Sequence, residues 1–249
     1  MKNLSHASAV VIGGSSGVGR ATVLALSSVV RRVFAVGRDR SKLEQVRSEA
    51  SGQVELRDFD ATSRPAIDAL LREAEPELVV LAAGVRPLLA PASEQSWESF
   101  CEPWNQDVKM AFELGQAAIA QPLRPGSTVI FISSGAGLGG SPLSGGYAGA
   151  KRMQMFLASY LQKVSDKKEL GIRFVALVPK QLIAGTVTGD VASRAYAEMA
   201  GISQDAFMQR FGAPLSPEAV AAALLAIARG EAGEGAPILG VTGKGLETL

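Results

Sequence analysis

A tyrosine and a lysine in the middle of the chain have the spacing of an acid–base pair. Tyr147 and Lys151 stand in the segment Tyr-Ala-Gly-Ala-Lys, and four residues along a helix return to the same face. A cation beside a phenol favours the phenolate, so the pair can supply a proton donor near working pH. Taken alone, such a pair is more often a surface contact, so its interpretation depends on the surrounding sequence.

A serine follows a predicted strand shortly before this pair. The apolar run Thr128–Ile132 predicts the strand, and Ser133 and Ser134 come directly after it. Ser134 lies 13 residues before Tyr147, at the C-terminal edge of the expected sheet, where folds of this kind bind ligands. This placement favours catalysis over a surface pair.

A glycine-rich segment near the N-terminus has the composition of a phosphate-binding loop. Residues 13–19 read Gly-Gly-Ser-Ser-Gly-Val-Gly, between the apolar run Ala9–Ile12 and a helical pattern over Val18–Val30. Glycines let the backbone approach a pyrophosphate, and a helix N-terminus offers free N–H groups and a positive dipole end. The strand-to-helix context favours nucleotide binding over a plain tight turn. The residues expected at the phosphates are Gly13, Ser15, Ser16, Gly17, Val18 and Gly19.

The elements that must position these groups alternate along the chain. Short runs rich in Val and Ile recur with longer helical patterns between most of them, and the long patterns over residues 104–120 and 147–164 are apolar on more than one side. The alternation predicts an α/β fold: a doubly wound, Rossmann-type parallel sheet of about seven strands with helices on both faces. We expect a single domain over residues 1–249, because the length suits one domain and no linker or repeat interrupts it.

Residues 180–215 are too long for an ordinary connection and lack strand patterning, so they predict a substrate lid with short helices. The segment has few charges, which favours an apolar or aromatic ligand or, equally, packing of the lid on the body. Its large apolar residues are Leu182, Ile183, Val187, Tyr196, Met199, Phe207 and Met208.

The composition argues against several classes of function. Lys and Arg total 25 against 24 acidic residues, so the chain has no basic surplus for nucleic acid. One cysteine, Cys101, and one histidine, His6, disfavour a disulfide, metal catalysis and a Ser-His-Asp triad. The apolar runs are too short to span a membrane, and we expect a cytoplasmic protein without a membrane partner.

The motifs in this order and spacing, namely Gly13-x-x-x-Gly17-x-Gly19, Ser134 and Tyr147-x-x-x-Lys151, resemble those of the short-chain dehydrogenase/reductase family over nearly the whole chain. The resemblance implies that Tyr147 is the general acid or base at a carbonyl or alcohol oxygen and that Ser134 hydrogen-bonds the same oxygen. It also implies that Lys151 binds the nicotinamide ribose and favours ionisation of the phenol. Ser133 is interpreted as structural, because the 13-residue spacing matches Ser134.

The resemblance further predicts the adenosine side of the site and the assembly. An acidic residue usually ends the second strand in NAD enzymes, whereas Gly37 stands here with Arg38 after it, which favours NADP(H). Alternatively, Arg38 is a surface arginine paired with Asp39. Other expected cofactor contacts are Asp60, Ala61, Ala83, Gly84 and Pro179. Asp60 also suits a helix cap. A homodimer or homotetramer is implied through the helices that carry Ala111, Phe112, Met153, Met155 and Phe156, although these residues suit an ordinary core as well.

Three segments of the chain depart from the family pattern. Leu81-Ala82 replaces two asparagines, and Lys180 replaces the glycine after Pro179, with Ala184 at the expected threonine and Thr186 two residues on. Asp107 occupies the place of the relay asparagine and is expected near Lys151, or equally on the helix surface.

The leading hypothesis is an NADP-dependent oxidoreductase that transfers hydride between NADPH and a small carbonyl or alcohol compound. A non-catalytic NADP-binding regulatory protein, or an isomerase or lyase on the same scaffold, is the alternative.

Overall fold

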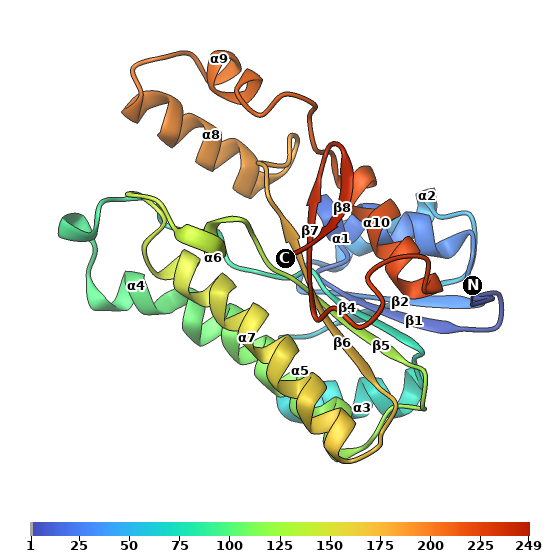
Figure 1. The fold of residues 1–249 in the computed structure, drawn as a ribbon. Helices are drawn as coiled ribbons and strands as arrows, with labels where there is room; N and C mark the ends of the chain where they lie inside the picture. Colours follow the sequence, from blue (N-terminus) through green and yellow to red (C-terminus); the bar gives the residue numbers. More distant parts are fainter. Residues whose placement is uncertain (1) are drawn as a thin grey trace.

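The computed structural model describes residues 2–249, and its strands form one sheet in the order β3-β2-β1-β4-β5-β6-β7-β8 (Figure 1). The strands are β1 Ser8–Ile12, β2 Arg32–Gly37, β3 Val54–Asp58, β4 Leu78–Leu81, β5 Thr128–Ile132, β6 Arg173–Pro179, β7 Ile238–Thr242 and β8 Gly245–Thr248. The order reverses beside β1, so β1 and β4 flank the switch point at which open α/β sheets bind ligands. The predicted doubly wound fold is thereby confirmed.

The eighth strand differs from the prediction of about seven parallel strands. Strands β1 to β7 pair in parallel, as expected, but β8 pairs antiparallel with β7 across Leu239↔Thr248. Its four residues are mostly exposed at the sheet edge. Such an edge strand has no apolar run, which is why the sequence did not reveal it.

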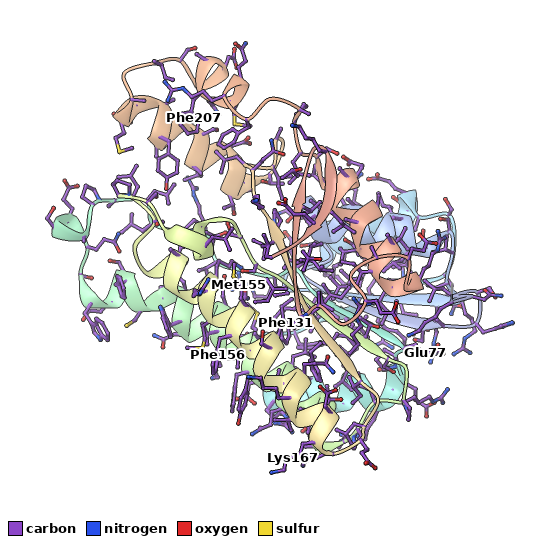
Figure 2. All side chains as sticks on the ribbon, in the orientation of Figure 1. Glu77, Phe131, Met155, Phe156, Lys167 and Phe207 are labelled. Atoms are coloured by element: carbon purple, nitrogen blue, oxygen red, sulfur yellow. The ribbon has the colours of Figure 1, made fainter. Side chains whose placement is uncertain are left out.

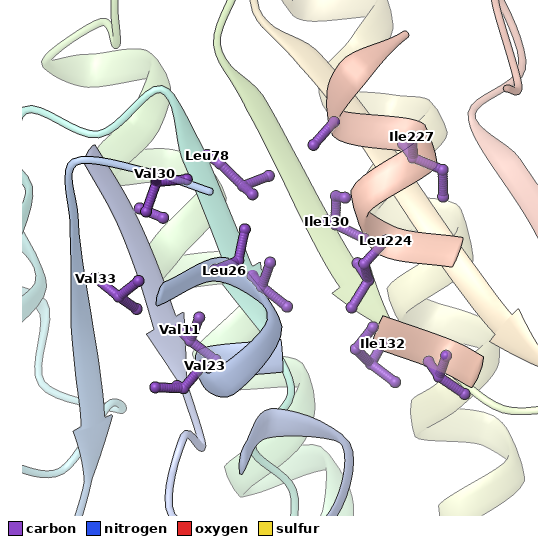
Figure 3. Packing of buried hydrophobic residues seen from close by; sticks show 14 of the residues in the cluster. Val11, Val23, Leu26, Val30, Val33, Leu78, Ile130, Ile132, Leu224 and Ile227 are labelled. Atoms are coloured by element: carbon purple, nitrogen blue, oxygen red, sulfur yellow. The ribbon is translucent and has the colours of Figure 1, made fainter. Parts of the chain in front are cut away.

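Helices cover both faces of the sheet. They are α1 Gly17–Ser27, α2 Arg40–Glu49, α3 Arg64–Ala74, α4 Trp97–Pro103, α5 Lys109–Ala120, α6 Ala136–Gly139, α7 Gly145–Lys167, α8 Val187–Met199, α9 Gln204–Gln209 and α10 Pro217–Arg229, with a 3₁₀ turn at Ala92–Glu94. On one face, Val11 lies beside Val23 and Leu26 of α1, and Ile130 of β5 lies beside Leu224 of α10 (Figure 3). On the other face, α3, α5 and α7 lie against the sheet (Figure 1). Burial on both faces explains the continuous apolar runs of the central strands.

The long helical segment before β5 begins earlier than predicted and is interrupted. Helical conformation starts at Trp97 instead of Trp104, because Ser96 caps the helix by accepting a hydrogen bond from Ser99 N. A π-helical turn, Trp104–Val108, separates α4 from α5. Such turns insert one extra residue and often mark functional sites. This turn carries Asp107.

The two long helices α5 and α7 have a buried and an exposed side. Ala111 and Met155 are fully buried core residues, whereas Phe112 and Phe156 are about half exposed. In Figure 2, Met155 and Phe131 lie between α7 and the sheet, and Phe156 points away. Ala111 and Met155 are therefore core residues, as one of the two interpretations expected, whereas Phe112 and Phe156 are not.

Residues 180–215 contain α8 and α9, which lie beyond the C-terminal edge of the sheet (Figure 1). Thr186 caps α8 by accepting a hydrogen bond from Gly189 N, and Ser203 caps α9 in the same way from Ala206 N. The two ends of the segment meet in a bridge between Ile183 and Leu215.

Candidate active site

The glycine loop between β1 and α1 requires glycine for steric reasons. Gly13 has a φ of +88°, and a Cβ on it would collide with Ala83 N in the loop after β4. A Cβ on Gly19 would collide with Gly13 O. Ser16 begins α1 without a side-chain cap, so the first N–H groups of the helix remain free for a ligand. The loop has the close backbone packing and open helix end of a pyrophosphate cradle.

A hollow of about 230 Å³ lies beside this loop at the ends of β2, β3 and β4. The expected cofactor residues at this end all line it, namely Gly13, Ser15, Ser16, Arg38, Asp60, Ala61, Ala83 and Gly84. A Cβ on Gly37 would lie 3.4 Å from Ser15 Oγ, at van der Waals contact, so Ser15 and position 37 are neighbours in this corner of the hollow.

Arg38 is exposed at the rim of this hollow. The alternative in which it pairs with Asp39 is wrong. The Asp39 carboxylate instead accepts a hydrogen bond from Lys42 N at 3.1 Å and forms an ion pair with Lys42 Nζ at 3.2 Å. Within residues 2–249, Arg38 has no ion-pair partner. Its guanidinium is therefore free to bind an anion.

Asp60 forms a turn and does not cap the following helix. Its Oδ1 accepts hydrogen bonds from Thr62 N and Thr62 Oγ1, both at 2.9 Å, and Ser63 is the residue at the start of α3. The backbone N–H of Thr62 and then its hydroxyl hold the pKa of Asp60 below its usual value, with help from the charge of Arg38. The capping alternative is wrong, and the carboxylate is ionised at neutral pH.

A second hollow of about 400 Å³ continues from the first, because Ser16, Ala82, Gly84 and Val85 line both. Its lining includes the residues expected to be catalytic, Ser134, Tyr147, Lys151 and Asp107, together with Pro179. Together the two hollows form one groove from the end of β2 to the N-terminus of α7.

The groups expected to act on a substrate come from β5 and α7. Ser134 follows β5 and is half-buried, with its Oγ accepting a hydrogen bond from Ala136 N at 3.2 Å. Tyr147 lies in the first turn of α7, and Lys151 Nζ is 5.5 Å from the centroid of its ring. Ser133 is buried and donates a hydrogen bond to Lys151 O at 2.7 Å. Ser133 thus joins β5 to α7, and both serines line the second hollow.

Asp107 is fully buried and forms an ion pair with Lys151. Its Oδ2 lies 3.1 Å from Lys151 Nζ, and its Oδ1 accepts a hydrogen bond from Val85 N at 2.8 Å. Oδ2 therefore places a negative charge in contact with the Lys151 ammonium. The alternative that placed Asp107 on the helix surface is wrong.

Lys151 is buried among three oxygen atoms. Besides Asp107, its Nζ donates hydrogen bonds to Gln154 Oε1 at 3.1 Å and to Ile132 O at 3.3 Å. Burial lowers the pKa of Lys151, but the negative charge of Asp107 and the neighbouring Tyr147 more than offset it, so the pKa is raised. The ammonium therefore keeps its charge at neutral pH. Sequence reasoning missed Gln154, although it lies three residues after Lys151 on the same helix face.

Thr186 reaches the glycine loop from the opposite side of the groove. A Cβ on Gly17 would lie 3.4 Å from Thr186 Cγ2, and Thr186 lines the second hollow. Ala184 is exposed, and Lys180 points to β8, where its Nζ pairs with Glu247 at 2.6 Å. The family's threonine position is held by Ala184, but it is Thr186, two residues later, that comes close to the glycine loop.

Two further properties concern the described chain as a whole. Across residues 2–249, every helix is too short or too polar to span a bilayer. The same residues bring together no group of three His, Cys, Asp or Glu side chains suited to a metal ion.

Comparison with known proteins identifies the class. The sequence profile of the short chain dehydrogenase family matches residues 7–193. An uncharacterized oxidoreductase of Myxococcus xanthus is 30% identical, over 72% of this chain and 73% of the relative. A 2,5-dichloro-2,5-cyclohexadiene-1,4-diol dehydrogenase of Sphingobium indicum is 27% identical over 81% of each chain. The crystal structure of an NAD⁺-bound xylitol dehydrogenase matches with a TM-score of 0.78 and 18% identity, over 91% of this chain and 94% of that chain.

The chain therefore belongs to the short-chain dehydrogenase family, a class of oxidoreductases that use a nicotinamide cofactor. The glycine loop fits such a cofactor, because it leads directly into the N-terminus of α1, where Ser16 makes no side-chain cap.

Proposed function

We propose that this protein is an NADP-dependent oxidoreductase that transfers hydride between NADPH and a carbonyl or alcohol carbon. The observation that carries the proposal is the single groove that joins the glycine loop to Ser134, Tyr147 and Lys151. In such a groove the bound nicotinamide supplies or accepts the hydride, and the protein's own residues handle the proton.

Each polar group of the groove has a role that suits its chemistry. Tyr147 donates its hydroxyl proton to the oxygen of the carbonyl during reduction and accepts it back during oxidation. Ser134 donates a hydrogen bond to the same oxygen, where negative charge develops. Lys151 provides a fixed positive charge beside the phenol ring, 5.5 Å from its centroid. Asp107 adds a stabilising negative charge beside that buried ammonium.

NADP is proposed over NAD because of the end of β2. Arg38 is exposed, has no carboxylate partner within residues 2–249 and lines the first hollow, the one beside the glycine loop. A guanidinium there suits a 2′-phosphate, and Ser15 Oγ adds a second donor beside Gly37. A backbone glycine at position 37 offers no side-chain acceptor for ribose hydroxyls.

The substrate is proposed to be a small carbonyl compound with an apolar body, held under a lid made of residues 180–215. Leu182, Ile183 and Val187 of this segment line the second hollow, which also contains Tyr147 and Lys151. Across the entrance, Tyr196 of α8 hydrogen-bonds Ser141 of the loop before α7. Tyr196 also stacks on Phe207 of α9, so the aromatic residues pack the lid together rather than line the hollow. The proposal of an apolar ligand is therefore supported by Leu182, Ile183 and Val187 alone among the large apolar residues of the lid.

A homo-oligomer is also proposed, through the exposed sides of α5 and α7. Phe112, Phe156 and Tyr160 are 46%, 57% and 51% exposed there, and Phe156 stacks on Tyr160 with 5.8 Å between ring centroids. Large aromatic side chains gathered on one surface are typical of an interface.

The experiment that tests the function is a screen of NADPH oxidation over ketones, quinones and β-ketoacyl thioesters, run beside direct NADPH titration. NADPH binding with turnover of a carbonyl compound is the expected result. Binding without turnover of any compound would favour the regulatory alternative. Conversion of a substrate without net consumption of NADPH would favour the isomerase or lyase.

A further inference from the structure

Gln154 is a polar side chain that the proposed chemistry leaves without a role, although it is fully buried in α7 beside the site. Its Oε1 accepts a hydrogen bond from Lys151 Nζ at 3.1 Å, and its Nε2 donates to Asp107 O at 3.4 Å. An ammonium can only donate and a carbonyl can only accept, so the Gln154 amide must turn its oxygen to Lys151 and its nitrogen to Asp107 O. The orientation of this buried amide is therefore set by its two hydrogen-bond partners.

The three oxygen atoms around Lys151 Nζ contribute differently. Asp107 Oδ2 supplies a negative charge at 3.1 Å. Gln154 Oε1 and Ile132 O supply aligned hydrogen bonds without charge. Charge alone would draw the ammonium toward the carboxylate, because Coulomb attraction has no angular preference. The two neutral acceptors instead favour one orientation of the ammonium, because hydrogen bonds are directional.

We propose that Gln154 is a positioning residue that aims the Lys151 ammonium at Tyr147 and the cofactor groove against the pull of Asp107. Relatives with a neutral asparagine at the position of Asp107 have no such pull to oppose. This inference rests on the proposed function, since the aim of Lys151 matters only if Tyr147 and a nicotinamide cofactor work beside it.

The test replaces Gln154 by methionine, which keeps the length of the side chain and removes the acceptor. Gln162→Met is the matched control: Gln162 lies two turns further along α7 and is also hydrogen-bonded, to Phe174 N at 2.8 Å and to Asp166 at 2.8 Å, but far from Lys151 in the helix. Both variants lose a glutamine of α7, so both report the cost of a lost structural hydrogen bond.

In Gln154→Met, the ammonium turns toward Asp107 and its field at the phenol weakens. The basic limb of the alcohol-oxidation pH profile should move to higher pH by about half to one unit, and the Kd for NADPH, measured by the fluorescence of the cofactor, should rise about threefold to tenfold. Gln162→Met should leave both quantities at their wild-type values. An unchanged pH profile and Kd in folded Gln154→Met, or the same changes in Gln162→Met, overturns the proposal.

A measurement on the wild type keeps the inference testable without cofactor. With ¹⁵N-labelled lysine, an ammonium held by two aligned hydrogen bonds in a buried site should exchange its protons slowly enough to be seen near neutral pH, whereas exposed lysines should not. The signal should vanish in Lys151→Met. Absence of any such resonance from the wild type contradicts the inference. Failure of the wild type to bind NADPH, with the resonance present, contradicts the proposed function instead.

Discussion

Replacing Asp107 by asparagine removes one negative charge from the ion pair with Lys151 while keeping the shape of the side chain. The carboxylate is fully buried, and its Oδ2 lies 3.1 Å from Lys151 Nζ. The remaining oxygen can still accept the hydrogen bond from Val85 N. The variant therefore changes the electrostatics of the site with little change in its geometry.

The size of the effect follows from this distance. Two unit charges 3.1 Å apart attract by about 5 kcal/mol at an effective dielectric constant of ~20. The cost of burying the carboxylate offsets a large part of that. Without Asp107, the positive charge of Lys151 is no longer cancelled at Tyr147, so the phenolate is favoured. The basic limb of the alcohol-oxidation profile should move to lower pH by about 1–2 units.

The assay compares kcat/KM for alcohol oxidation against pH in the wild type and in Asp107→Asn. A parallel urea titration should show a loss of roughly 3 kcal/mol of unfolding free energy, because the buried ammonium loses its charged partner. An unchanged pH profile, with the fold and NADPH affinity preserved, would refute the reasoning and make Asp107 a bystander. A shift to higher pH would reverse the sign of the argument.

Three further outcomes follow from the site. Tyr147→Phe should lower kcat by orders of magnitude and leave NADPH affinity nearly intact; retention of more than about a tenth of the wild-type kcat would exclude Tyr147 as the acid. Arg38→Gln should lower the preference for NADPH over NADH at least about tenfold in direct titrations of both cofactors, and an NADH preference in the wild type would contradict the assignment of Arg38. Gly19→Ala should abolish binding of either cofactor or unfold α1, because its Cβ collides with Gly13 O; normal affinity in this variant would show that the loop is not the cradle.

Much of the fold could be predicted because the central strands are buried on both faces. The core residues of β1, β2, β4, β5 and β6 form continuous apolar runs, which can be recognised in the sequence. The hairpin strand β8 escaped for the opposite reason. Its residues Gly245–Thr248 are held by pairing with β7 and bury little apolar surface, and backbone pairing leaves no mark on the side-chain pattern.

The site was predictable only where its residues share a local pattern. Gly13, Gly17 and Gly19 follow one strand closely, so their spacing was enough to group them. Tyr147 and Lys151 are four residues apart on one helix, so their spacing predicted that they share a face. The contact between Thr186 and Gly17 joins positions far apart in the sequence. The path of the loop 180–186 sets it, and the loop has no periodicity to reveal that path.

Asp107 could be placed near Lys151 only through the family resemblance. Helical spacing puts Asp107 on the same buried side as Ala111 and Leu114, but it does not identify which residues of other elements lie opposite. In the structure, Asp107 meets both Lys151 Nζ and Val85 N. One carboxylate thus ties Lys151 to the loop after β4, which lines both hollows of the groove. Under the proposed function, a change at Asp107 acts on cofactor binding through Val85 as well as on proton transfer through Lys151. Asparagine, which keeps the bond to Val85, separates these two effects, whereas alanine loses both together.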